Sequence, residues 1–209
     1  MSNDVKHSEE EVREIYRANF QDGLDEIFDG ILLIVTGLQS YFLHLIFDLL
    51  MMPYYFVFTI VFVILIIVAL PLSKRKFTFT RLGIRKLPPL PTMLKIIIFV
   101  PLILVAALII LQPIMELDFL GNGFMVPVGA YMIIMFTAYA VWLHLPRYYI
   151  TGILFTVGML FGESQIYFEL NPLYGLIIPI GLGLAFLGFG IHMARQFSQK
   201  YPKKPIANM

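Results

Sequence analysis

The 209-residue chain contains no cysteine and few charged residues, since Asp, Glu, Lys and Arg together make up only 14% of it. The absence of cysteine excludes disulfide bonds, thiolate metal ligands and a cysteine nucleophile, and it leaves the redox compartment open. Soluble domains contain roughly 25% charged residues. Because the chain is 59% hydrophobic, with a mean hydropathy of +0.82, its composition predicts an integral membrane protein of the all-α class.

The chain also lacks the motifs that carry chemistry in membrane enzymes. It contains no H-E-x-x-H zinc motif, no G-x-S-x-G nucleophile motif, no phosphate-binding loop and no pair of carboxylates inside a hydrophobic segment. We therefore expect a non-enzymatic protein with no catalytic residue, no cofactor, no metal site and no nucleic-acid partner.

A cleavable signal is the next missing feature, because the polar and acidic N-terminal segment has no basic region followed by an early apolar core. The first hydrophobic segment is then expected to stay as an anchor. A spanning helix needs ~20 mostly apolar residues. Six stretches qualify, of which the fifth is the weakest because Glu163 interrupts its apolar run: Gly30–Phe47, Tyr54–Leu72, Leu94–Gln112, Met125–Leu145, Tyr148–Phe168 and Tyr174–Ala194.

The basic residues predict the orientation of these spans. Short loops rich in Lys and Arg stay in the cytoplasm. With six spans and a cytoplasmic N-terminus, every Lys and Arg except Lys95 falls in an inner segment, and the predicted outer loops contain no basic residue. We therefore predict a cell-membrane protein with both termini in the cytoplasm. Its parts are a cytoplasmic helix (1–29), a six-span domain (30–194) that includes a basic cytoplasmic loop (73–93), and a basic tail (195–209).

Four acids directly precede the first predicted span. Asp22, Asp25, Glu26 and Asp29 are spaced i, i+3, i+4 and i+7, which places them on one face of a helix. The pattern predicts one amphipathic helix from about Ser8 into the first span, ending at Phe47, with Ser8 and Glu11 as a capping box.

This acidic face requires counter-charge, and the loop 73–93 contains the densest basic sequence. One hypothesis is that the loop folds against the acids, with Arg81 and Arg85 as the docking residues. The other is that the acids are solvated while anionic lipid headgroups hold the loop. The sequence leaves both interpretations open.

Glycines form a second pattern in the first and last predicted spans. Gly23, Gly30 and Gly37 recur every seven residues and therefore share one slowly drifting helix face. Small residues allow helices to approach closely in lipid. We expect these glycines to pack against a neighbouring helix, and we expect the same of Gly181 and Gly188 in the sixth span.

Ionisable residues inside the spans are scarce. His44 lies near the outer end of the first span, and Glu163 is the one carboxylate that falls within a predicted span. Such residues are candidates for a transport pathway. A carboxylate at a helix end is more often at the interface, so these two residues are weak pathway candidates.

Three stretches, NFQDGLDEIFDGILLIVTGL, FTFTRLGIRK and ARQFSQKYP, resemble motifs of an uncharacterised family of small multi-pass membrane proteins from bacteria and archaea. The chain departs from the loop motif of that family at Thr80, where the family has proline, and at Ile84, where it has an aromatic residue. The resemblance implies that Asp22–Gly23 and Arg81–Gly83 act together, and it implies no activity.

These patterns together predict an accessory or scaffold subunit that engages a partner at its cytoplasmic face. A small transporter or channel is the alternative, and a water-filled cavity at mid-membrane would favour it. The expected partners are anionic lipid headgroups and a second protein or another copy of the chain.

Overall fold

The computed structural model describes residues 8–45, 61, 64–66, 68–84, 87–111, 125–168 and 171–202. Within these ranges every regular element is a helix, and no strand is present. The predicted all-α class is therefore confirmed. The second predicted span, Tyr54–Leu72, and the predicted outer loops lie mostly outside the described residues.

The N-terminal segment forms two helices, α1 (Glu9–Phe20) and α2 (Leu24–Leu45). The predicted capping box of Ser8 and Glu11 is present at the start of α1. The single helix predicted over 8–47 is wrong, because the chain turns between α1 and α2. Gly23 there has a φ of 77°, a left-handed conformation that glycine adopts without steric cost. We call residues 21–23 the elbow.

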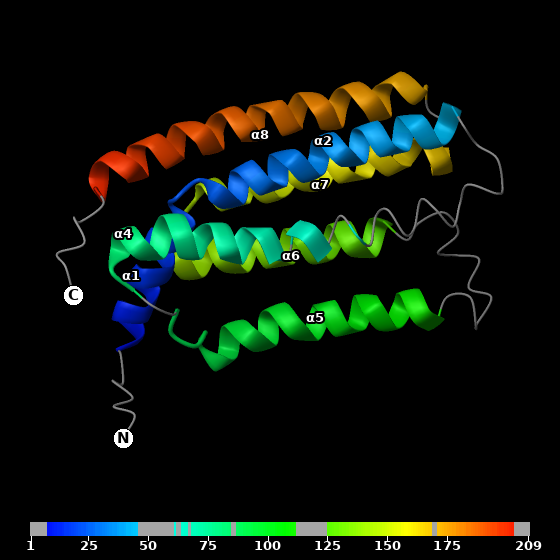
Figure 1. Ribbon diagram of the computed structural model, residues 1–209. Coiled ribbons are helices and arrows are strands. Elements are labelled where there is room, and N and C mark those ends of the chain that lie inside the picture. The colour runs from blue at the N-terminus through cyan, green and yellow to red at the C-terminus, as the bar shows by residue number, and fades with distance from the viewer. Residues whose placement is uncertain are drawn as a thin grey trace.

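Asp22 starts the second helix at this elbow. Its Oδ1 accepts a hydrogen bond of 2.9 Å from the backbone N–H of Leu24, one of the amides that the new helix leaves without a helical partner. The Asp22–Gly23 pair thus ends one helix and begins the next. As a result α1 lies across one end of the bundle while α2 runs along it (Figure 1).

The long helices lie side by side in a bundle (Figure 1). They are α2, α5 (Thr92–Leu111), α6 (Met125–Leu143), α7 (Arg147–Phe168) and α8 (Pro172–Lys200). A short π-helix, η2 (Arg75–Phe79), continues the helical turns over 68–74 and leads into α4 (Thr80–Leu82) at the same end of the bundle as α1. Buried side chains of α2, α6, α7 and α8 form the core, and Val12 and Tyr16 of α1 cover its end.

One described helix, over Leu173–Lys200, is long and apolar enough to cross a membrane. Shorter apolar helical stretches cover Thr92–Leu104, Gly129–Leu143 and Arg147–Phe161. A helical bundle with one candidate spanning helix is therefore what the described residues show, and the six-span topology stays a prediction.

Glycines bring α2 and α8 into backbone contact. A Cβ atom on Gly30 would lie 2.6 Å from the carbonyl oxygen of Gly183, and one on Gly190 would lie 2.7 Å from that of Gly23. A Cβ atom on Gly37 would lie 3.1 Å from the side-chain Cβ of Pro179 and 3.3 Å from the carbonyl oxygen of Leu176. Gly30 of α2 thus meets Gly183, and Gly23 of the elbow meets Gly190. The two glycines on each side are seven residues apart, and α8 runs antiparallel to α2 (Figure 1).

The expectation for Gly181 and Gly188 requires correction. Among the described residues, nothing lies within 4 Å of a Cβ built on either glycine, so neither lets a described helix approach closely. The packing glycines of α8 follow two residues later, at Gly183 and Gly190. Two residues turn a helix by about 200°, which puts the two sets on nearly opposite faces.

Candidate functional site

The acids of the elbow and of the first turn of α2 lie inside the protein. Asp22 is fully buried and Glu26 is only 1% exposed, although both are ionisable. Asp25 and Asp29 are partly buried. Buried carboxylates are rare unless cations or hydrogen bonds compensate them. The partners of these four acids therefore determine how their charge is stabilised.

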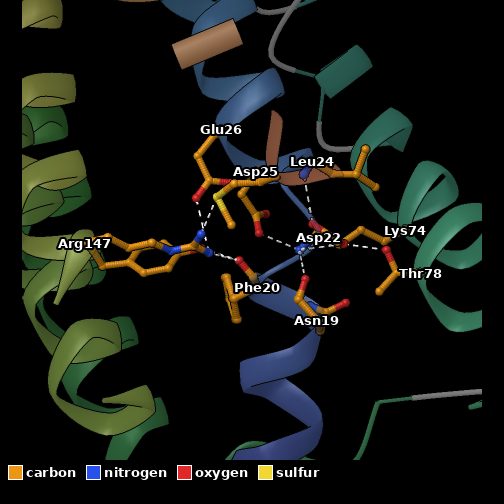
Figure 2. A network of polar contacts seen from close by, with 11 residues as sticks. Asn19, Phe20, Asp22, Leu24, Asp25, Glu26, Lys74, Thr78 and Arg147 are labelled. Carbon is orange, nitrogen blue, oxygen red and sulfur yellow. Dashed lines mark hydrogen bonds and ion pairs between the residues drawn. The ribbon is translucent and has the colours of Figure 1, made fainter. Parts of the chain in front are cut away.

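Lys74 supplies the first counter-charge from the segment before η2 (Figure 2). Its Nζ lies 2.6 Å from Asp25 Oδ2 and 3.8 Å from Asp22 Oδ2. It also donates a hydrogen bond of 3.1 Å to the backbone carbonyl of Asn19 and lies 4.7 Å from the ring centroid of Phe20. A lysine that is only 7% exposed therefore has an acid, a carbonyl and an aromatic face around it.

Thr78, one turn further along, completes the contact with Asp22. Its hydroxyl donates a hydrogen bond of 2.5 Å to Asp22 Oδ2 (Figure 2). Asp22 therefore joins the helix start of Leu24 to the basic segment through its two oxygens. The family resemblance implied that Asp22–Gly23 and Arg81–Gly83 act together. In the structure Asp22 instead meets Thr78, three residues before Arg81.

Arg147 supplies the second counter-charge from the first turn of α7. Its guanidinium lies 3.4 Å from Glu26 Oε1, and it donates a hydrogen bond to the backbone carbonyl of Phe20 (Figure 2). The hydroxyl of the adjacent Tyr148 also donates to that carbonyl, at 3.2 Å. The last carbonyls of α1 would otherwise have no helical partner, so Arg147 and Tyr148 fasten α1 to α7.

Sequence reasoning missed Arg147 as a site residue. Its position could have indicated the role. Arg147 is the only basic residue in the two-residue inner turn between the fourth and fifth predicted spans. A turn that short fixes its side chain at the end of the bundle, on the same side as the acids.

The structure does not place Arg81 against the acids. Its guanidinium donates hydrogen bonds to the carbonyls of Ser198, at 3.3 Å, and of Tyr201, at 2.9 Å. These carbonyls end α8, where the helix dipole favours a cation. The basic segment therefore reaches the acids through Lys74 and Thr78, while Arg81 fastens it to α8. Arg85 lies outside the described residues.

Burial raises the pKa values of the two most enclosed carboxyl groups. The pKa of Asp22 is raised to about 6, with the nearby Lys74 opposing part of the effect. The pKa of Glu26 is raised to about 7, chiefly by burial and against the attraction of Arg147. Neither oxygen of Glu26 has a hydrogen-bond partner in the described structure. This cluster of four carboxyl groups and two cations can therefore hold a proton near neutral pH.

The remaining sequence candidates lie elsewhere. The backbone of His44 belongs to α2 and that of Glu163 to α7, and their side chains are outside the described set. Among the described residues, no group of three or more His, Asp or Glu side chains could hold a metal ion.

Comparisons of the chain with protein-family models, with curated proteins and with solved structures find no match. The family resemblance of the three sequence stretches therefore stays a prediction.

Proposed function

We propose that the chain is a non-enzymatic membrane protein of six spans that acts as an accessory or scaffold subunit. In this proposal the bundle anchors a rigid cytoplasmic end, and α1 presents that end to a partner. The observation that carries the proposal is the charge cluster at the elbow, which fastens α1, the segment before η2 and the start of α7 to one another.

The outer faces of the bundle support its placement in a membrane. The large apolar side chains of α5 are extensively exposed, with Met93 75% and Ile103 64% accessible. α8 continues the pattern with Ile177 at 61%. The α5 and α6 helices contain 20 and 19 residues, which gives each a length of about 30 Å, the thickness of the hydrocarbon core. Lipid is the solvent that such faces require.

Tight packing favours a scaffold over a transporter. The α2 and α8 backbones touch along the glycines, and Gly158 of α7 closes on Leu33 of α2 in the same layer. Leu33 is fully buried. Thr137, a polar residue of α6, borders an apolar groove between α5 and α6. The fixed contacts in the middle of the bundle leave the charged end as the surface for a partner.

Both signs of charge reach the solvent at that end. Glu9, Glu10 and Glu14 of α1 are exposed, and so are Arg195 and Lys200 near the end of α8. The elbow acids are enclosed by Lys74 and Arg147 and therefore do not form this surface. A partner would meet the glutamates of α1 or the basic end of α8 rather than the acidic stripe.

Single-cysteine labelling tests the placement, because the natural chain has no cysteine. Variants Lys76→Cys and Asp118→Cys should react from opposite sides of sealed cells, with Asp118→Cys accessible from outside. Labelling of both from one side would contradict the six-span topology.

Photo-crosslinking in intact cells tests the scaffold role. A photoreactive amino acid at Glu14 or Arg195 should give a discrete adduct, and the same group at Leu184, an exposed residue in the middle of α8, should give none. Absence of an adduct from both end positions would contradict a stable cytoplasmic partner.

A further inference from the structure

Two hollows meet at Arg147, where α7 and α8 lie side by side. The first has a volume of about 320 Å³ and apolar walls, and the second has a volume of about 290 Å³ and contains two glutamines. Besides Arg147, the first is lined by Ile150, Thr151, Leu154, Leu182, Ala185, Phe186 and Phe189, and the second by Gln21, Leu145, Met193, Gln196 and Phe197.

The α8 residues in both linings follow one another along a single helix face. Leu182, Phe186, Phe189, Met193 and Gln196 are separated by three or four residues, the spacing of neighbours on a helix surface. From the first to the last, the helix rises about 21 Å. One leaflet of a bilayer contributes about 15 Å of hydrocarbon. The two hollows thus form an amphipathic groove of the length of one acyl chain and its headgroup.

Arg147 has unused capacity for an anion. Among the described residues, its buried Nε has no hydrogen-bond partner, and its Nη1 donates to the sulfur of Met193, which is a weak acceptor. Its side chain is 21% exposed, so it remains reachable from the groove. A guanidinium with free donors matches the oxygen atoms of a phosphate.

We propose that this groove binds an anionic phospholipid, with an acyl chain against Phe186 and Phe189 and the phosphate at Arg147, Gln21 and Gln196. The inference rests on the proposed membrane placement and gives the anionic headgroups expected from the sequence a defined site. A lipid bound there would extend the junction of α1, α7 and α8 and keep the elbow in place.

The groove between α5 and α6 serves as a natural comparison. It is larger, about 500 Å³, and equally apolar, but Glu9 rather than a cation borders it. Lipid chains can fill it without selection, and an anionic headgroup would be repelled there.

Fluorescence quenching by brominated lipids in proteoliposomes tests the site. Trp142, the only tryptophan, is replaced by Phe, which loses no hydrogen bond because the Trp142 Nε1 has no partner. A reporter tryptophan is then introduced as Phe189→Trp or, in the control groove, as Ile134→Trp; these positions are 46% and 43% exposed. Each protein is reconstituted into phosphatidylcholine mixed with phosphatidylglycerol, with bromine on either lipid.

We expect brominated phosphatidylcholine to quench both reporters, since both face lipid. At Phe189→Trp, phosphatidylglycerol should be preferred about fivefold, the effect of one nearby cation, with no preference at Ile134→Trp. Arg147→Gln should abolish the preference. Gln196→Glu should do the same through an exposed residue, which keeps the test decisive if Arg147→Gln does not fold. Arg195→Gln, on the same helix outside the groove, should retain it.

The remaining outcomes separate the two proposals. A lack of preference at Phe189→Trp, or an equal preference in both grooves, would overturn the lipid site and leave the membrane placement intact. If brominated phosphatidylcholine quenched neither reporter, the membrane placement itself would be overturned.

Discussion

The contacts of α2 with α8 and of α5 with α6 represent two ways to join helices in one bundle. In the first pair, glycines face backbone across the interface, and even a Cβ atom would collide. In the second pair, side chains meet loosely around a groove of about 500 Å³, and most of the large apolar side chains described for α5 are exposed. The charge cluster lies at the end of the tight pair. We infer that α2 and α8 form a rigid frame for the elbow and that α5 is a peripheral helix.

Among the substitutions that test this comparison, Gly30→Leu should lower the free energy of unfolding most. The new side chain would occupy the position of the Gly183 carbonyl, so the helices would have to separate, and the free energy of unfolding should fall by more than about 3 kcal/mol. Denaturant titration in detergent measures it. Gly181→Leu is the matched control, because its Cβ points into open space, and it should change stability by less than about 0.5 kcal/mol. Equal losses would show that the glycine contact is not formed.

The pH dependence of stability should come from the charged end of the tight pair. The pKa of Glu26 is about 7 in the folded protein and has an ordinary value of 4.5, and that of Asp22 is raised in the same direction. The folded state therefore binds more protons between these values, so the contribution of these two groups to stability is fully present below about pH 4 and is lost as the pH rises to about 7. From Glu26 alone the loss between about pH 5 and pH 8 is roughly 2–3 kcal/mol.

Chemical denaturation across that pH window measures this slope. Glu26→Gln should flatten it, because the amide does not titrate. A protein that instead gained stability as the pH rose from 5 to 7 would contradict the enclosed state of the two carboxyl groups.

Removal of one ionic partner should have a smaller effect. Arg147→Met leaves Glu26 buried beside an apolar side chain, and because the arginine is partly exposed we expect a loss of about 2 kcal/mol at neutral pH. Adding Glu26→Gln in the same chain should recover part of that loss. The double-mutant cycle in detergent detects this coupling, whereas strictly additive losses would mean that the two groups do not interact.

The smallest effect is expected in the loose pair. Ala138 lines the groove between α5 and α6, so Ala138→Leu places its extra carbons in existing space and should change stability by less than about 1 kcal/mol. The same titration as for Gly30→Leu gives the comparison. A loss as large as that of Gly30→Leu would show that α5 and α6 are packed as closely as α2 and α8.

Local patterns predicted a good part of this fold. The capping box at Ser8 and the seven-residue glycine repeat of α2 were read correctly, because each depends on spacing within one helix. The elbow was missed because Asp22 and Gly23 also fit the helical periodicity of the acids around them. In the structure, the hydrogen bond from the Leu24 N–H to Asp22 and the left-handed conformation of Gly23 end α1 and start α2 despite that periodicity.

Partners across the chain were harder to predict. One of the two interpretations that the sequence left open placed the basic loop against the acids, with Arg81 and Arg85 as the docking residues. In the structure the length of the helical turns over 68–74 and η2 puts Lys74 at Asp25, and it carries Arg81 on to the end of α8. Which basic residue contacts the acids depends on the direction and length of the helix that carries it. The number of charges in a segment does not reveal either property.

The sequence by itself determined that the chain is helical and apolar, that its charges gather outside the hydrophobic segments, and that α2 has a face narrow enough for another backbone. These properties follow from composition and from periodicity within one helix. Only the tertiary structure decided that Gly183 and Gly190, rather than Gly181 and Gly188, pack against the glycines of the N-terminal segment. It also decided that Lys74 and Arg147 are the cations that pair with the acids. The physical reason is that rotation about a helix axis and the order of helices around a bundle are fixed by contacts between segments distant in the chain.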